Sequence, residues 1–163
     1  MSTMTRTIYI AVLFCGLNAT AALAAAGDCG VNGGGVFDAT VTGPADSGDA
    51  SFGGSIVAKG CQIDSDIHGS FFIHFADGST FRSSNFDSFA PITLAGDSYY
   101  AIVIGMGTFK GEVYSYELEL EEALPGDTPA HIVLQLDDPF PSTIYLDARG
   151  DVTRGNFDVF DNQ

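Results

Sequence analysis

Apolar and polar residues alternate most regularly in the segment 112–122, which reads EVYSYELELEE. The set expected to face the core is Tyr114, Tyr116, Leu118 and Leu120, and the set expected to face solvent is Val113, Ser115, Glu117, Glu119 and Glu121. Successive side chains of a β-strand point to opposite faces, so this period of two predicts a half-buried strand. On a helix, Leu118 and Leu120 would point about 200° apart and leave no apolar face. Glutamates two positions apart on a strand lie about 7 Å from each other, so we interpret them as a solvated face and not as an ion site.

Short alternating segments of this kind recur along the chain after residue 26 and are separated by Gly, Pro and Asp. The expected strands are Val36–Thr42, Ser51–Ala58, Cys61–Ile67, Ser70–Phe75, Thr80–Phe86, Tyr99–Ile104, Glu112–Glu122, His131–Leu136, Thr143–Asp147 and Asn156–Phe160. The segment NGGGVF (32–37) is expected to lead into the first of them. Turns are expected at Asp77-Gly78, Gly105-x-Gly107, Pro125-Gly126-Asp127 and Arg149-Gly150-Asp151, among other places.

Many short strands between such turns, with no helical periodicity among them, predict an all-β antiparallel fold. We expect a β-sandwich of the jelly-roll or immunoglobulin-like type, with a partly closed β-barrel as the alternative. The lack of helical segments between the strands argues against a parallel α/β sheet.

The N-terminus has the layout of a secretory signal peptide. Arg6 precedes the apolar run Ile8–Leu17, and small residues with two Ala-x-Ala sequences follow. Cleavage is expected after Ala24 or Ala26, which gives a signal peptide of 1–26 and a single domain of 27–163. A membrane-spanning helix needs roughly 20 apolar residues, and this run is interrupted too early. We therefore expect a secreted or periplasmic protein with no membrane span in the mature chain.

Charge narrows the class of partner. All 21 acidic residues but only five of the six Lys and Arg follow residue 26, so the mature chain has a net charge of −16. Such a surface repels nucleic acid and anionic lipid. We expect no nucleic-acid partner, and the acidic surface is explained first by the need for solubility.

Two cysteines, Cys29 and Cys61, remain after the signal peptide. An even pair in an oxidising compartment predicts a disulfide. It would close a loop of about 30 residues and stabilise the fold by roughly 3 kcal/mol. The chain has no CxxC sequence and no histidine near either cysteine at a metal-binding spacing, which argues against a metal site there.

The sequence contains no recognisable catalytic constellation. His74 is expected on the solvent side of its strand beside Phe72, and His131 begins another strand. Neither belongs to an HxH or HExxH pattern, and there is no Gly-x-Ser-x-Gly nucleophile elbow. We therefore expect a protein that is not an enzyme and that has no cofactor.

The remaining residues offer one candidate place for calcium and little for sugar binding. Asp137 and Asp138, at the end of a buried strand, are the best candidates for calcium, which prefers oxygen ligands in turns. A sugar platform would need exposed aromatic rings, and the chain has no Trp. Tyr99 and Tyr100 are adjacent in a strand, so only one of them can face solvent.

Several segments taken together, in this order, resemble the post-COAP type domain. They are NGGGVF (32–37), ASFGGSIVAKG (50–60), GSFFIHFADGSTFRSSNFDSF (69–89), YYAIVIGMGTFKGEVYSYELELEE (99–122), PGDTPAHIVLQLDD (125–138) and IYLDARGDVTRGNFDV (144–159). The resemblance implies a small exported bacterial β-sandwich-like module, often appended to larger extracellular proteins, with no catalytic residues to carry over. The Cys29/Cys61 pair and the nearly stand-alone chain depart from the usual setting of that family.

These observations lead to three hypotheses for the function. The first is an exported non-enzymatic β-sandwich module with a structural, adhesion or protein-interaction role and an unknown protein or cell-envelope partner. The second is a calcium-stabilised lectin-like binding module. The third is a small secreted hydrolase that uses turn carboxylates.

Overall fold

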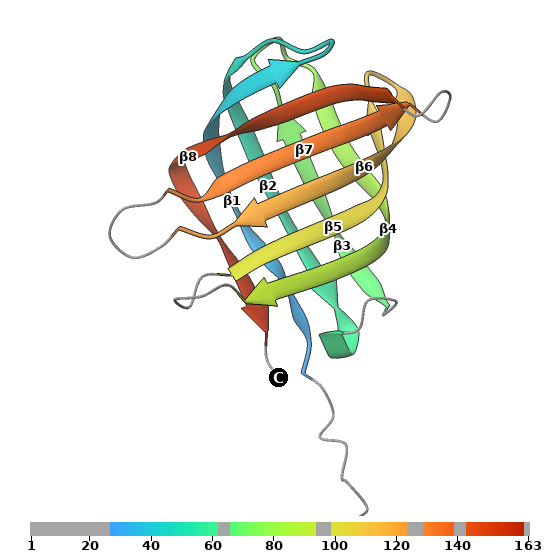
Figure 1. Cartoon of the computed structure of the whole chain (residues 1–163), viewed down its shortest axis with the longest axis vertical. Helices are drawn as coiled ribbons and strands as arrows, with labels where there is room; N and C mark the ends of the chain where they lie inside the picture. Colours follow the sequence, from blue (N-terminus) through green and yellow to red (C-terminus); the bar gives the residue numbers. More distant parts are fainter. Residues whose placement is uncertain (1–26, 62–65, 94–98, 124–128, 139–142, 162–163) are drawn as a thin grey trace, which may run out of the picture.

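The computed structural model describes residues 27–61, 66–93, 99–123, 129–138 and 143–161. Within these ranges the chain forms eight strands, and each is antiparallel to the next (Figure 1). The strands are β1 Cys29–Thr42, β2 Gly48–Ala58, β3 Ile67–His74, β4 Thr80–Thr93, β5 Tyr99–Phe109, β6 Glu112–Glu121, β7 His131–Asp138 and β8 Thr143–Asp161. A short 3-10 turn, η1 (Lys59–Cys61), follows β2.

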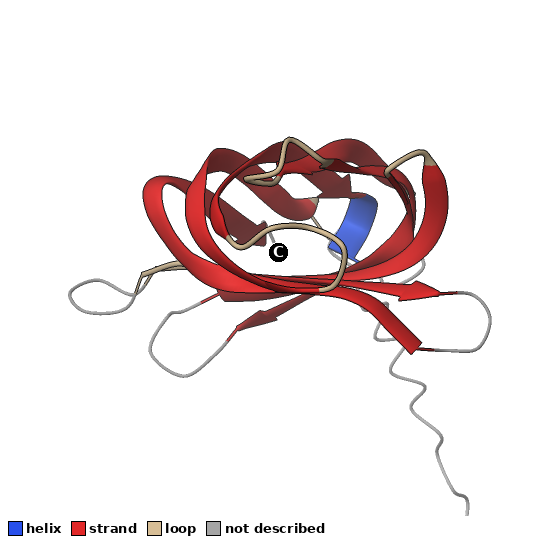
Figure 2. Ribbon diagram, turned by 90° about the horizontal axis from the view of Figure 1, so that it is seen from above, coloured by secondary structure: helices blue, strands red, loops and turns tan. Residues whose placement is uncertain are grey.

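The last strand pairs with the first, so the sheet closes on itself into a barrel (Figure 2). The β1–β8 ladder runs from Cys29↔Asp161 to Thr42↔Asp147, with one register shift near Val36. The predicted all-β antiparallel fold is confirmed, and its architecture is the barrel that stood as the alternative to a sandwich. The barrel is closed and not partly closed, because every strand has a hydrogen-bonded neighbour on both sides.

Several glycines that were expected to mark turns lie inside strands instead. NGGGVF is part of β1, Gly105 and Gly107 are part of β5, and Arg149-Gly150-Asp151 is part of β8. The two strands expected at 143–147 and 156–160 are therefore one. A Cβ atom on Gly150 would lie 1.9 Å from the carbonyl oxygen of Asp38 on β1. Glycine is needed at such positions because two backbones approach closely, and this requirement looks like a turn signal in the sequence.

The strand expected at Cys61–Ile67 is also wrong, because Cys61 belongs to η1 and Asp66 lies outside any strand. Only Ile67 is in a strand, as the first residue of β3, and β3 corresponds to the strand expected at Ser70–Phe75. Gly60 and Cys61 both have positive φ, which turns the chain away from β2. Residues 62–65, the expected turn at Pro125-Gly126-Asp127 and the expected signal peptide lie outside the described residues.

A tight turn was expected at Gly105-x-Gly107, but the structure has it a few residues later, between β5 and β6. Lys110 and Gly111 are the two loop residues, with φ of 50° and 87°. Two consecutive positive φ values are those of a type I′ turn, whose twist matches that of the flanking strands. Lys110 also donates to the carbonyl of Pro44 and forms an ion pair with Asp77 at 3.3 Å, which joins this turn to two others at the same end of the barrel.

The barrel interior is filled by apolar side chains from every strand. The largest of those that are fully buried are Tyr116, Phe37, Phe81, Phe89, Phe109, Phe157, Ile56, Ile73, Leu118, Leu120, Ile132 and Leu134. Phe52 contacts three other rings, with centroids 6.0 to 6.4 Å away. An eight-stranded barrel has an interior just wide enough for side chains to fill, and this chain fills it with its own. The interior is therefore a core.

Candidate functional site

The predicted disulfide is present in the structure. Cys29 at the start of β1 and Cys61 at the end of η1 are bonded, with their Cα atoms 5.2 Å apart. Cys29 is fully buried. The bond attaches the connection after β2 to the edge of the barrel where β1 and β8 also meet, so its role is structural.

The calcium candidates lie at the end of β7. Asp137 is exposed and pairs with Ser115 of β6 and Ile144 of β8, while the backbone of Asp138 pairs with Thr143. Both were expected in a turn, and both belong to the strand. Within the described residues, no three His, Cys, Asp or Glu side chains are grouped so that they could hold a metal ion. Calcium binding at this place stays a prediction.

The three histidines lie apart from one another. His68 forms an ion pair with Asp66 at 2.9 Å on the surface. The Nδ1 atom of His74 lies 2.7 Å from the hydroxyl of Thr80, and its ring is 5.0 Å from that of Phe72 on the outer face of β3, as the alternation predicted. His131 is the histidine that lines a hollow.

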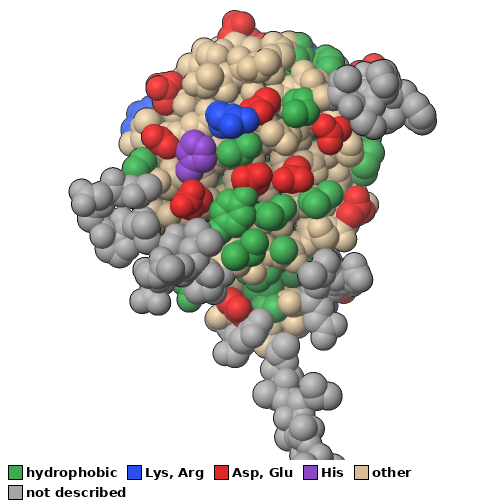
Figure 3. All heavy atoms as spheres, in the orientation of Figure 1, with side chains coloured by type: hydrophobic (Ala, Val, Ile, Leu, Met, Phe, Trp, Pro, Cys, Tyr) green, Lys and Arg blue, Asp and Glu red, His purple; other side chains and the backbone are tan. Residues whose placement is uncertain are grey.

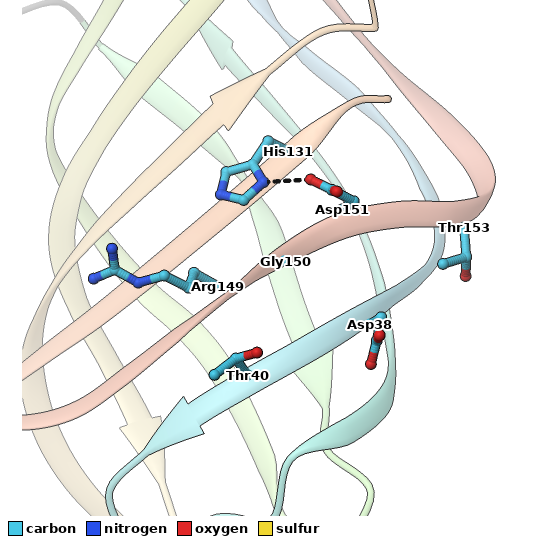
Figure 4. A pocket seen from close by; sticks show the side chains of 7 residues that line it. All are labelled: Asp38, Thr40, His131, Arg149, Gly150, Asp151 and Thr153. Carbon is cyan, nitrogen blue, oxygen red and sulfur yellow. Dashed lines mark hydrogen bonds and ion pairs between the residues drawn. The ribbon is translucent and has the colours of Figure 1, made fainter. Parts of the chain in front are cut away.

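This hollow lies on the outer face of β7, β8 and β1 and has a volume of about 410 Å³ (Figure 4). Its lining residues are Asp38, Thr40, His131, Arg149, Gly150, Asp151 and Thr153. His131 and Asp151 are opposite one another in the β7–β8 ladder, and Nδ1 of His131 is 2.8 Å from a carboxylate oxygen of Asp151. The other side chains lie around the hollow without converging on one point.

A carboxylate and the imidazole that it orients are two of the three members of a catalytic triad, and the third is a nucleophile hydrogen-bonded to the imidazole. Among the described residues, His131 has no hydrogen bond to a serine, threonine or cysteine. The hydroxyl of Thr153 donates to the carbonyl of Val36 at 3.2 Å. No nucleophile in the described part of the chain contacts the imidazole, and the structure shows a hydrogen-bonded His131–Asp151 pair at the surface of the barrel.

Arg149 is occupied by a neighbour on its own strand. Its Nε atom is 2.9 Å from one carboxylate oxygen of Asp147, and a second, shorter contact joins Nη2 to the other oxygen. These hydrogen bonds, with a further one from Gln135, hold the pKa of Asp147 below its ordinary value. The guanidinium of Arg149 is therefore held along its own strand and away from His131 and Asp151.

A second feature of the outer face lies on β4, β5 and β6. Apolar side chains point away from the barrel and gather in one region of the surface (Figure 3). We define the outer apolar patch as Ile92 of β4 with Tyr100, Ile102 and Ile104 of β5. Ile92 and Ile104 are 39% and 40% exposed, whereas the isoleucine side chains that point into the barrel are fully buried.

An acidic row borders this patch. It consists of Glu117, Glu119 and Glu121 of β6, which pair in register with Ile104, Ile102 and Tyr100 of β5. The alternation predicted that these glutamates face outward, and the structure confirms it. They are half-buried and not fully solvated, because the neighbouring side chains of the patch cover part of them.

Within the acidic row, the environment of Glu117 disfavours the charged form of its carboxyl group. Burial, followed by the charge of the neighbouring Glu119, raises the pKa of Glu117 above its ordinary value. Burial and a hydrogen bond to Glu119 raise the pKa of Tyr100, so its hydroxyl stays protonated and donates to that carboxylate. Within the described part of the chain, none of the three glutamates has an ion pair with Lys, Arg or His.

The sequence did contain a signal for the outer apolar patch. The segment YYAIVI (99–104) is apolar at both parities, whereas a strand with one wet face should alternate. Tyr99 packs against the core and Tyr100 faces outward, so the prediction that only one of them faces solvent is confirmed.

Comparisons with known proteins do not assign this chain to a family. Protein-family models, curated proteins and solved structures were searched, and none of the three comparisons gave a match. The described residues include no helix with the length and apolarity needed to cross a membrane. The resemblance to the post-COAP type domain therefore stays a prediction from the sequence, and the function has to be argued from the barrel itself.

Proposed function

We propose that this chain is an exported, non-enzymatic β-barrel module that acts by binding another protein through the outer face of β4, β5 and β6. One observation carries the proposal: an apolar patch faces outward from a barrel whose interior is already filled by its own side chains. Contiguous apolar patches on a protein surface commonly mark interaction sites. A filled interior directs binding to the outside of the barrel.

Export is supported by three independent features. The first 26 residues have the layout of a signal peptide, the cysteines are paired, and the mature chain is strongly acidic. Disulfides persist mainly in oxidising compartments, which favours a secreted or periplasmic location.

Photo-crosslinking in the producing cells tests the proposal. A benzoylphenylalanine at position 104, in the outer apolar patch, should give a defined protein adduct. The same residue at position 32 on β1, which is exposed on the opposite side of the barrel, should not. Equal adducts from both positions, or none from position 104, would contradict the proposed function.

The two rival functions have direct tests as well. A calcium-stabilised module would melt at a lower temperature in EGTA, whereas the proposed module melts at the same temperature with and without it. A hydrolase would act on a panel of ester, glycoside and peptide substrates and would lose activity in Asp137→Asn or His131→Asn. The proposed module is inactive on all of them.

A further inference from the structure

The face of β4, β5 and β6 contains two parallel features of different chemistry. The outer apolar patch follows β5, and the acidic row follows β6 in direct register with it. Neighbouring strands are about 5 Å apart, so each glutamate of the row lies about that far from the β5 side chain with which it is in register. The β5 part of the patch, from Tyr100 to Ile104, extends for about 14 Å along the strand.

The cations beyond β6 are already engaged, and Arg82, which is exposed on β4, lies opposite Thr108 of β5, beyond the Ile104 end of the patch. Beyond β6, His131 is paired with Asp151, and Arg149 is paired with Asp147. The other pairs among the described residues involve Lys59, His68 and Lys110, which lie at the ends of the barrel. The acidic row therefore forms no ion pair with a Lys, Arg or His of the described residues, although the charge of Glu119 acts on Arg149.

Charge decides between the possible occupants. A second copy of this chain would bring another acidic row against the first, and the mature chain already carries a net charge of −16. Juxtaposed like charges oppose such a contact. An anionic lipid surface is repelled for the same reason. A cationic protein segment is attracted, and its charges would compensate carboxylates that are already half-buried.

From this geometry we propose that the face of β4, β5 and β6 docks a basic amphipathic segment of a partner protein. Its apolar side chains lie on the outer apolar patch, and its Lys or Arg side chains pair with the acidic row. This inference rests on the proposed function and deepens it by naming the chemistry of the partner. Three turns of an amphipathic helix, about 16 Å long, match the length of the β5 part of the patch.

The test uses a synthetic helical peptide of about 16 residues with a leucine stripe flanked by lysines. Its control is the same peptide with glutamate in place of every lysine. Titration into the ¹⁵N-labelled mature protein with its disulfide intact, at low salt, should shift amide signals of β4, β5 and β6 for the lysine peptide. The glutamate peptide should bind at least about tenfold more weakly, because like charges now face one another.

Single-residue variants, each with a control variant elsewhere on the barrel, show which side chains contact the lysine peptide. Ile102→Ser and Ile104→Ser should each weaken binding by about tenfold, since burial of one aliphatic side chain is lost. Glu119→Gln should weaken it by about three- to fivefold at low salt and have less effect at high salt, because salt screens exposed charges. Asp49→Asn, on the exposed face of β2, and Ile144→Ser, on β8, are the controls and should leave the affinity unchanged. Melting temperatures close to that of the wild type confirm that each variant is folded.

The outcomes separate the inference from the proposed function. Equal binding of the two peptides, or no binding of either, overturns the basic partner, and crosslinking at position 104 then decides whether the face still binds protein. Self-association that increases with concentration and is lost in Ile102→Ser overturns it in favour of a second copy. Binding to vesicles of zwitterionic or anionic phospholipid that is lost in the same variant overturns it in favour of a lipid surface.

Discussion

Truncation of a side chain at the centre of the barrel tests whether the interior is a filled core. Leu134 of β7 is fully buried, and its neighbours in the ladder, Leu118 of β6 and Ala148 of β8, are fully buried as well. Leu134→Ala removes three carbons, which is worth about 2.4 kcal/mol at about 0.8 kcal/mol for each buried carbon. The strands cannot move inward freely because each is hydrogen-bonded on both sides, so a cavity remains and adds about 1 kcal/mol.

The expected loss is therefore about 3–4 kcal/mol in the free energy of unfolding. Urea denaturation followed by far-UV circular dichroism and tyrosine fluorescence measures it, since the chain has no Trp. Val133→Ala is the matched control, because Val133 is the preceding residue, lies on the outer face and is half-buried. It should cost less than about 1 kcal/mol.

A loss of less than about 1.5 kcal/mol for Leu134→Ala, or one equal to that of Val133→Ala, would refute the reasoning. Either result would mean that the interior has room to adjust and that a ligand inside the barrel has to be considered.

Three further predictions follow from particular contacts. The pKa of Glu117 is raised in the folded state, so ionisation of this carboxyl group opposes folding. The free energy of unfolding, measured by urea titration, should therefore increase as the pH falls from 7 towards 5. The variant Glu117→Gln should show a smaller increase. A decrease in wild-type stability over this range, with no difference in the variant, would contradict the assigned environment. Reduction of the Cys29–Cys61 bond should lower the free energy of unfolding by roughly 3 kcal/mol, and two alkylated thiols in untreated mature protein would show that the bond does not form. Gly111→Ala should cost about 1 kcal/mol because φ at this position is 87°, and an unchanged melting temperature would show that the turn has another geometry.

The sequence predicts the features of this fold that depend on a single pattern, such as apolar–polar alternation or the number of cysteines. The period of two in β6 gave the correct side for Tyr116, Leu118 and the acidic row, because burial on one face of a strand leaves a direct pattern. The count of two cysteines after residue 26 gave the correct disulfide.

Features that depend on contacts between distant segments could not be derived in this way. Closure of the barrel requires β1 to pair with β8, more than 100 residues away, and strands in a sandwich would show the same alternation. Gly150 was interpreted as a turn residue because the close approach of Asp38 on β1 leaves no mark on its neighbours in sequence. The hollow at His131 likewise combines β1, β7 and β8, which no spacing in the sequence brings together.

Closure of the barrel is the central claim, since it makes the interior a core and leaves the outer face for binding. The most direct test is the measurement of nuclear Overhauser effects between β1 and β8 in the labelled mature protein. A closed barrel gives cross-strand contacts from Val31 to Val159 at one end of the ladder and from Thr40 to Arg149 near the other. Loss of both sets, while the β1–β2 and β7–β8 contacts remain, would show an open sheet and contradict the account.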